Sequence, residues 1–113
     1  MRVLLYCSDG KTRSRLAFAL RFAGANVMEP VRPAKLVELA RAERPDLVIL
    51  DDPQAAGMAE KLREVPELKG VTIALGLEVV RPCRAATYVW PSPLETTSAV
   101  SLVRSASVAA QSA

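Results

Sequence analysis

The chain has 113 residues, which fits a single domain spanning residues 1–113, and half of them are hydrophobic, enough to build a core. It has no apolar run of the roughly 18 residues that a membrane helix needs, and its first residues lack the long apolar region of a signal peptide. We therefore expect a cytoplasmic protein with no membrane segment. The net charge of +3 is spread along the chain without a block of like charges, so direct binding of nucleic acid is not expected.

The residue types that carry most metal and acid–base chemistry are scarce. The chain has no histidine, which removes the commonest general base and the commonest metal ligand. Its two cysteines, Cys7 and Cys83, lie far apart and have no recognised zinc-site spacing, so we interpret them as free thiols. We expect neither a bound metal nor a cofactor.

The first half of the chain alternates apolar runs with helical patterns. Residues 2–7 form an apolar run typical of a buried parallel strand, and residues 12–23 place an apolar stripe on one helical face before Gly24, which suits a helix end. A short strand is predicted at residues 26–29, and a helix from Pro33 to near Pro45. The run DLVIL at residues 46–50 predicts the third strand.

The second half continues the alternation, with one short connection. A helix is predicted at residues 55–65, strands at residues 71–75 and 86–90, and a last helix at residues 95–109. The segment between the fourth and fifth strands is too short for a full crossover and contains Pro82, so a fourth helix should be shortened or absent there. The small polar residues 109–113 are expected to fray.

Alternating strands and helices predict an α/β fold with a parallel sheet and helices on both faces. Five segments also resemble the receiver domain of bacterial response regulators: RVLLYCSDG, FAGANV, ERPDLVILDD, VTIAL and the SPL before the last helix. The resemblance covers about the whole chain. It implies a flavodoxin-like (CheY-like) five-stranded sheet in the order 2-1-3-4-5, with a site at the carboxyl ends of the strands.

The resemblance also implies a phosphorylation site from which most of the working residues are missing. Active receivers use an acidic pair that holds Mg²⁺, an acceptor Asp, a hydroxyl residue and a Lys. Asp51 stands at the acceptor position, but the other positions fall on Cys7 and Ser8, on Gly76, and on Trp90 or Ser92. Asp9 and Asp52 are the nearby carboxylates that could join Asp51 in an acidic cluster. The resulting vestigial phosphoacceptor site comprises Asp51, Asp52, Asp9, Cys7, Ser8, Gly76 and Ser92.

Physical chemistry argues against ordinary phosphorylation at this site. Mg²⁺ requires hard oxygen ligands in near-octahedral geometry, and a thiol and a hydroxyl are poor substitutes for two carboxylates. Phosphoryl transfer also depends on a metal and a cation to neutralise the transferred group. We therefore interpret the chain as a non-catalytic pseudo-receiver that serves bacterial signalling as a protein–protein interaction or scaffold module. A receiver still phosphorylated on Asp51 is one alternative.

A second alternative is an enzyme. The segment C-S-D-G-K-T-R-S resembles the phosphate loop of low-molecular-weight tyrosine phosphatases, in which Cys7 would be the nucleophile, Arg13 the phosphate clamp and Ser14 a support for the thiolate. Asp9 within this segment would repel phosphate, however, and a cysteine at the end of a strand is commonly a buried structural residue.

The expected partner is a protein. In signalling receivers the usual interaction surface involves the fifth strand and the last helix, and loss of the fourth helix should leave this side less covered. We therefore predict that Trp90, Leu94, Leu102 and Ala106 lie in or near a partner surface, which could also form a homodimer. We also expect a cis peptide bond between Ser92 and Pro93.

Overall fold

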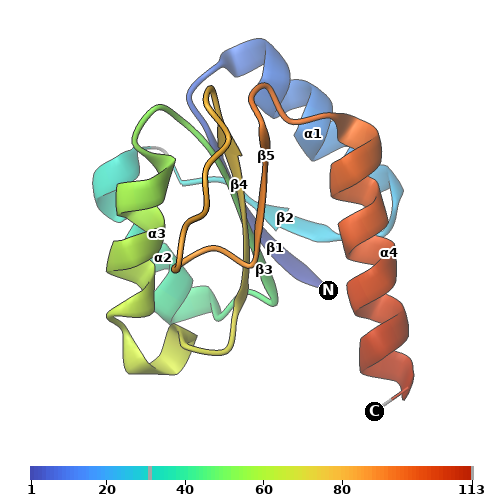
Figure 1. The fold of residues 1–113 in the computed structure, drawn as a ribbon. Coiled ribbons are helices and arrows are strands. Elements are labelled where there is room, and N and C mark those ends of the chain that lie inside the picture. The colour runs from blue at the N-terminus through green and yellow to red at the C-terminus, as the bar shows by residue number, and fades with distance from the viewer. Residues whose placement is uncertain (31, 113) are drawn as a thin grey trace.

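The computed structural model describes residues 1–30 and 32–112, with side chains as far as Ser105 (Figure 1). Strands and helices alternate along these residues except between the last two strands, and 3-10 turns occur at Pro33–Lys35 and Pro66–Leu68. In chain order the elements are β1 (Arg2–Cys7), α1 (Gly10–Phe22), β2 (Asn26–Met28), α2 (Leu36–Glu43), β3 (Leu47–Asp51), α3 (Ala55–Arg63), β4 (Thr72–Leu77), β5 (Tyr88–Pro91) and α4 (Thr96–Ser112).

The strands form one parallel sheet in the order β2-β1-β3-β4-β5, which confirms the predicted flavodoxin-like topology. The register places four residues in one row near the carboxyl ends of the strands: Cys7 pairs with Asp51, Asp51 with Gly76, and Gly76 with Trp90. Paired residues in a sheet project to the same face. The row therefore brings residues of four different strands to one side of the sheet edge.

Helices cover both faces of the sheet, with α1 and α4 on one side and α2 and α3 on the other (Figure 1). Successive residues of a strand face opposite sides of the sheet. In β1, Val3 and Leu5 pack toward α1 and α4, whereas Leu4 packs toward α2 and α3. Strand β3 is buried along its whole length, as expected for a central parallel strand covered on both faces.

Helix α1 begins at Gly10, two residues earlier than predicted. Asp9 is its N-cap, and its Oδ2 accepts hydrogen bonds from the backbone N of Thr12 at 3.0 Å and from the Thr12 hydroxyl at 2.6 Å. The helix ends at Phe22, and Gly24 follows with φ of 95°, a left-handed conformation that glycine adopts without strain. Residues 10–14 are therefore the first helical turn rather than a loop.

Helix α4 extends to Ser112, beyond the end predicted at Ala109. The fraying of residues 109–113 stays a prediction. None of the helices in the described residues is both long enough and apolar enough to cross a membrane.

The connection between β4 and β5 is short and contains no helix, as predicted; all of its residues, 78–87, are described. Arg63, at the end of α3, contacts both the turn before β4 and the last residues of this connection. Its guanidinium donates to the Thr87 hydroxyl at 3.4 Å and to four backbone carbonyls at 2.6–3.3 Å, those of Leu68, Lys69, Val71 and Ala85. One side chain thus links the end of α3 to the chain on both sides of β4.

Candidate functional site: the carboxyl edge of the sheet

A cleft of about 470 Å³ opens at the carboxyl edge of the sheet. Its lining includes six of the seven residues predicted for the vestigial site: Ser8, Asp9, Asp51, Asp52, Gly76 and Ser92. The seventh, Cys7, is buried beneath the cleft and does not line it. The chain therefore brings these residues together at the end of the sheet where open α/β folds place their ligands.

Asp51 is the buried centre of this edge, with 6% of its surface exposed. Its Oδ1 accepts a hydrogen bond from the Ser92 hydroxyl at 2.6 Å, and its Oδ2 accepts one from the backbone N of Leu94 at 2.8 Å. Both carboxylate oxygens are thus engaged by the segment that joins β5 to α4. The short distances are typical of hydrogen bonds to a charged acceptor.

Gly76 provides the space into which the Asp51 side chain is turned. A Cβ at position 76 would lie 2.9 Å from Asp51 Cγ, 3.0 Å from Asp51 Oδ2 and 3.0 Å from Leu94 Cγ. No side chain fits there while Asp51 keeps this position, because real Cβ contacts are longer. The inward position of the carboxylate therefore depends on the glycine, and a residue with a Cβ at position 76 would require the side chains of Asp51 and Leu94 to shift.

The residues after β1 are not arranged as a magnesium-binding pair. Ser8 donates its backbone N to the main-chain oxygen of Asp51 at 3.1 Å, and Cys7 is buried. The Asp9 carboxylate is engaged by Thr12, whose hydroxyl hydrogen bond holds the pKa of Asp9 below its ordinary value. The donor set is thus one exposed carboxylate, a hydroxyl and a buried thiol, which does not fit Mg²⁺.

The suggested acidic cluster of Asp9, Asp51 and Asp52 is not formed. Asp52 Oδ2 accepts a hydrogen bond from the backbone N of Gln54 at 2.7 Å, which ties this carboxylate to the turn before α3. Within the described residues, no group of three His, Cys, Asp or Glu side chains is placed to hold a metal ion. The carboxylates share the cleft, but each is committed to a different local contact.

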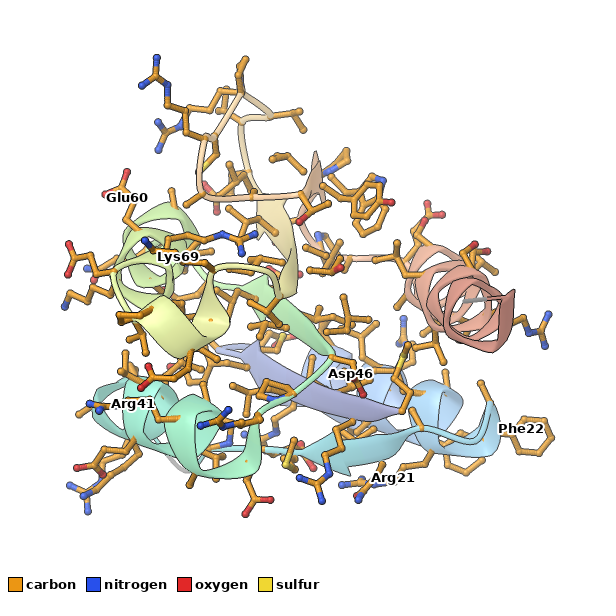
Figure 2. The ribbon with its side chains drawn as sticks, turned by 90° about the horizontal axis from the view of Figure 1, so that it is seen from below. Arg21, Phe22, Arg41, Asp46, Glu60 and Lys69 are labelled. Carbon is orange, nitrogen blue, oxygen red and sulfur yellow. The ribbon has the colours of Figure 1, made fainter. Side chains whose placement is uncertain are left out.

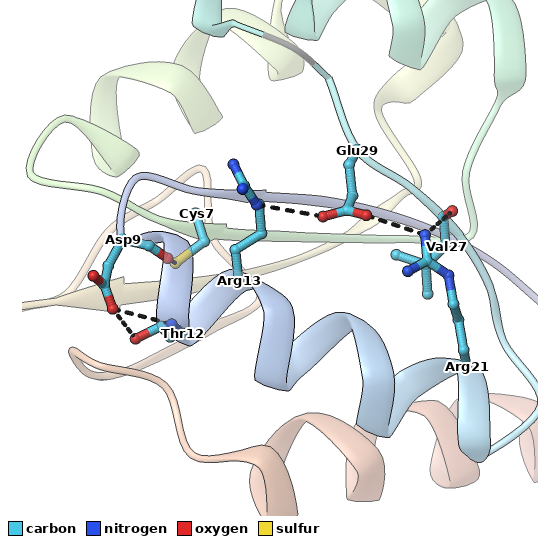
Figure 3. A network of polar contacts seen from close by, with 7 residues as sticks. All are labelled: Cys7, Asp9, Thr12, Arg13, Arg21, Val27 and Glu29. Carbon is cyan, nitrogen blue, oxygen red and sulfur yellow. Dashed lines mark hydrogen bonds and ion pairs between the residues drawn. The ribbon is translucent and has the colours of Figure 1, made fainter.

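The phosphate-loop interpretation of Cys7, Arg13 and Ser14 is not supported by the geometry. Burial raises the pKa of the Cys7 thiol to about 11, so the thiol is protonated at neutral pH. The Arg13 Nε lies 3.6 Å from Glu29 Oε1, so the guanidinium is paired with the segment after β2 (Figure 3). Ser14 is exposed on the same helix. No loop of amides surrounds Cys7, because α1 begins at Gly10.

Of the two candidates for the lysine position, Ser92 is the one that contacts Asp51. Trp90 is half-buried; it packs against the core and stacks on Tyr88, with ring centroids 5.5 Å apart and planes 3° from parallel. The predicted cis bond between Ser92 and Pro93 is present.

The predicted partner surface needs correction. Leu94 is 4% exposed and Leu102 is 9% exposed, and both belong to the core between the sheet and the α1–α4 layer. The apolar stripe of α4 that carries Leu102 packs inward, so assigning these two residues to an accessible surface was wrong. Trp90 remains accessible in part, and the side chain of Ala106 lies outside the described residues.

Two charged residues that the sequence did not single out, Glu78 and Arg81, also line the cleft. They belong to the connection after β4, which folds over the edge of the sheet. The only sequence signal for their position was the shortness of that connection.

No family model and no curated protein matches the chain. Solved structures do. The chemotaxis response regulator CheY4 of Vibrio cholerae matches with a TM-score of 0.79 and 17% identity, over 93% of this chain and 97% of that chain. A response regulator from Thermotoga maritima matches with a TM-score of 0.75 and 19% identity, over 93% and 95%.

An orphan response regulator of H. pylori matches with a TM-score of 0.75 and 16% identity, over 94% of this chain and 95% of that chain. The similarity thus extends over nearly the full length of both partners in each comparison, although few residues are shared. The chain has the fold of response-regulator receiver domains.

Proposed function

We propose that this chain is a pseudo-receiver: a non-catalytic protein–protein interaction or scaffold module of bacterial signalling, located in the cytoplasm. In this proposal its output does not depend on Mg²⁺-dependent phosphorylation of Asp51. The fold suits a signalling role, since the solved structures of similar fold are described as response regulators and a chemotaxis protein.

The observation that carries the proposal is the state of the Asp51 carboxylate. To accept a phosphoryl group, one of its oxygens must be free to approach phosphorus in line, beside a metal ion that neutralises charge. Here one oxygen accepts a hydrogen bond from the Ser92 hydroxyl, and the other accepts one from the backbone N of Leu94. The residues around it supply neither the metal ligands nor a lysine.

A protein partner fits this arrangement better than a small-molecule substrate. The thiol of Cys7 is buried, and the carboxylates of Asp9 and Asp52 accept hydrogen bonds from Thr12 and Gln54, so none of these three groups is poised as a nucleophile or base. A homodimer through β5 and α4 is less well supported, since two of the four residues predicted for it are buried.

Chemical phosphorylation tests the proposal. The protein is incubated with Mg²⁺ and acetyl phosphate, and its mass is measured before and after the reaction. We expect no phosphoryl adduct on the wild-type chain, while a receiver that carries the acidic pair and the lysine is modified under the same conditions. An adduct on the wild-type protein that is absent from an Asp51→Asn variant would overturn the proposal.

The same preparation tests the enzymatic alternative. We expect no hydrolysis of an aryl phosphate, because the Cys7 thiol is buried and protonated and Arg13 is paired with Glu29. Hydrolysis that disappears in Cys7→Ser would establish a phosphatase instead.

A further inference from the structure

The outer face of α1 exposes two aromatic side chains. Phe18 is 72% exposed and Phe22 is 86% exposed, the second pointing away from the rest of the fold (Figure 2). Their rings stack with centroids 6.3 Å apart and planes 18° from parallel. Within the described part of the chain, nothing packs over this pair to bury it.

Two basic residues, Lys11 and Arg15, lie on the same face of α1, nearer the start of the helix. At about 100° per residue, Lys11, Arg15, Phe18 and Phe22 fall within about 60° of one another. We call these four residues the α1 stripe. It lies opposite the buried Leu20, so a single surface combines two cations with an aromatic pair.

The charge of this face is strongly one-sided. Helix α1 carries four basic residues and no acidic one. Arg13 and Arg21 share Glu29, from the segment after β2, at 3.6 and 3.1 Å (Figure 3). Lys11 and Arg15 make no ion pair with any described residue. The cations of the α1 stripe are therefore available to an outside partner.

A shallow hollow of about 660 Å³ borders the stripe, lined in part by Ala17, Phe18, Phe22 and Glu29. It offers apolar contact beside the aromatic rings and polar groups at its margin. Exposing two phenylalanine side chains to water is unfavourable. The stacking of the two rings on one helix offsets only a small part of that free-energy cost. Such combined features are typical of protein-binding surfaces.

We infer that the α1 stripe binds an acidic, amphipathic segment of another protein. Acidic side chains of that segment would meet Lys11 and Arg15, while an apolar side chain would pack on Phe18 and Phe22 and into the hollow. This inference rests on the proposed function, since it names the surface and the partner chemistry of the interaction module.

Charge and geometry favour this partner over two others. The two rings stack on each other instead of standing open to take bases, and only two cations of the described α1 residues, Lys11 and Arg15, stand outside an ion pair, which is few for the phosphates of a nucleic acid. A second copy would bring one basic stripe against another, which is repulsive. An acidic polypeptide satisfies both the charge and the apolar area.

Selection from a random peptide display library tests the inference. The wild-type protein is the bait, and binding of the most enriched peptide is measured by fluorescence anisotropy. We expect enriched peptides to combine acidic and apolar residues. Affinity should fall roughly tenfold or more in the Phe18→Ser/Phe22→Ser variant and in the Lys11→Glu/Arg15→Glu variant. It should also fall as the salt concentration rises.

A matched control comes from another exposed apolar pair. Val79→Ser/Val80→Ser removes apolar surface from the connection after β4, where the two residues are 76% and 52% exposed, and should leave peptide binding unchanged. All variants should show the wild-type circular dichroism spectrum and melting midpoint, since the changed side chains are exposed.

Three outcomes would overturn the inference: no peptide enriched over the empty matrix, enriched peptides that are basic or uncharged, or binding that the α1 variants do not weaken. Stripe-dependent binding of a duplex DNA probe in place of peptides would also overturn it. Peptides that bind another face would leave the proposed function intact, whereas phosphorylation of Asp51 would overturn the proposed function whatever the peptides show.

Discussion

At the scale of single residues, the site is defined by one carboxylate turned inward. Asp51 ends a buried strand, and its side chain lies over Gly76, where any Cβ would come within about 3 Å of it. Ser92 and the backbone N of Leu94 then occupy its two oxygens. Asp51 thus acts as a structural hydrogen-bond acceptor that ties β3 to the segment before α4.

This role predicts the effect of removing the carboxylate. Asp51→Ala leaves the buried backbone N–H of Leu94 and the Ser92 hydroxyl without their acceptor, so the free energy of unfolding should fall by about 1–3 kcal/mol. Asp51→Asn keeps one acceptor oxygen and should lose less. Urea unfolding followed by circular dichroism measures both. An Asp51→Ala protein as stable as wild type would contradict the structural role.

Cys7 gives a prediction that depends on pH. Burial raises the pKa of its thiol to about 11, and the reactive form is the thiolate, so Cys7 should resist iodoacetamide at neutral pH while the partly exposed Cys83 is alkylated. Alkylation of Cys7 should rise only as the pH approaches 11. Mass spectrometry of the digested protein locates the label. Labelling of Cys7 at pH 7 as fast as that of Cys83 would show that the thiol is neither buried nor raised in pKa.

At the scale of elements, Arg63 compensates for a missing helix. One guanidinium joins the end of α3 to the turn before β4 and to the connection after it. The planar fork of an arginine can reach several carbonyls in different directions at once, which a lysine cannot do. The connection between β4 and β5 can therefore remain a short loop and still be held against α3.

We expect Arg63→Ala to lower the free energy of unfolding by about 2–3 kcal/mol, because it leaves several partly buried carbonyls without a donor. Arg63→Lys should recover little of this loss. The control is Arg41→Ala: Arg41 is exposed on α2 (Figure 2), and its removal should change stability by less than about 0.5 kcal/mol. Equal stability of the Arg63 and Arg41 variants in chemical denaturation would disprove the bracing role.

The sheet could be predicted because its strands are continuous apolar runs, such as DLVIL, bounded by turn residues. The hydrogen bonds of Asp51 could not, since they join residues 41 and 43 positions apart and depend on the path of the chain after β5. The burial of Leu102 was missed for a related reason. The apolar residues of the last helix do not by themselves reveal which of them face the core, and only the packing of α4 against the sheet, which buries Ala99, Leu102 and Val103, decides it.

At the scale of the whole molecule, two regions have different characters. The carboxyl edge of the sheet gathers the residues that the sequence predicts for a vestigial phosphoacceptor site, and Asp9, Asp51 and Asp52 are committed there to internal hydrogen bonds. The outer face of α1 instead leaves aromatic and basic side chains to the solvent. A receiver fold organised in this way would signal through a permanently formed surface rather than through a chemical change at Asp51.

The central claim is that Asp51 does not switch, and NMR of the backbone amides tests it directly. Mg²⁺ and beryllofluoride, a mimic of a phosphoryl group on aspartate, are added to the ¹⁵N-labelled protein, and the signals of Ser8, Ser92 and Leu94 are followed. An active receiver treated in the same way serves as the positive control. The three signals should stay where they are, because both oxygens of Asp51 accept hydrogen bonds and the described residues form no metal site beside them. Shifts of these amides that require both reagents, and that disappear in Asp51→Asn, would contradict it.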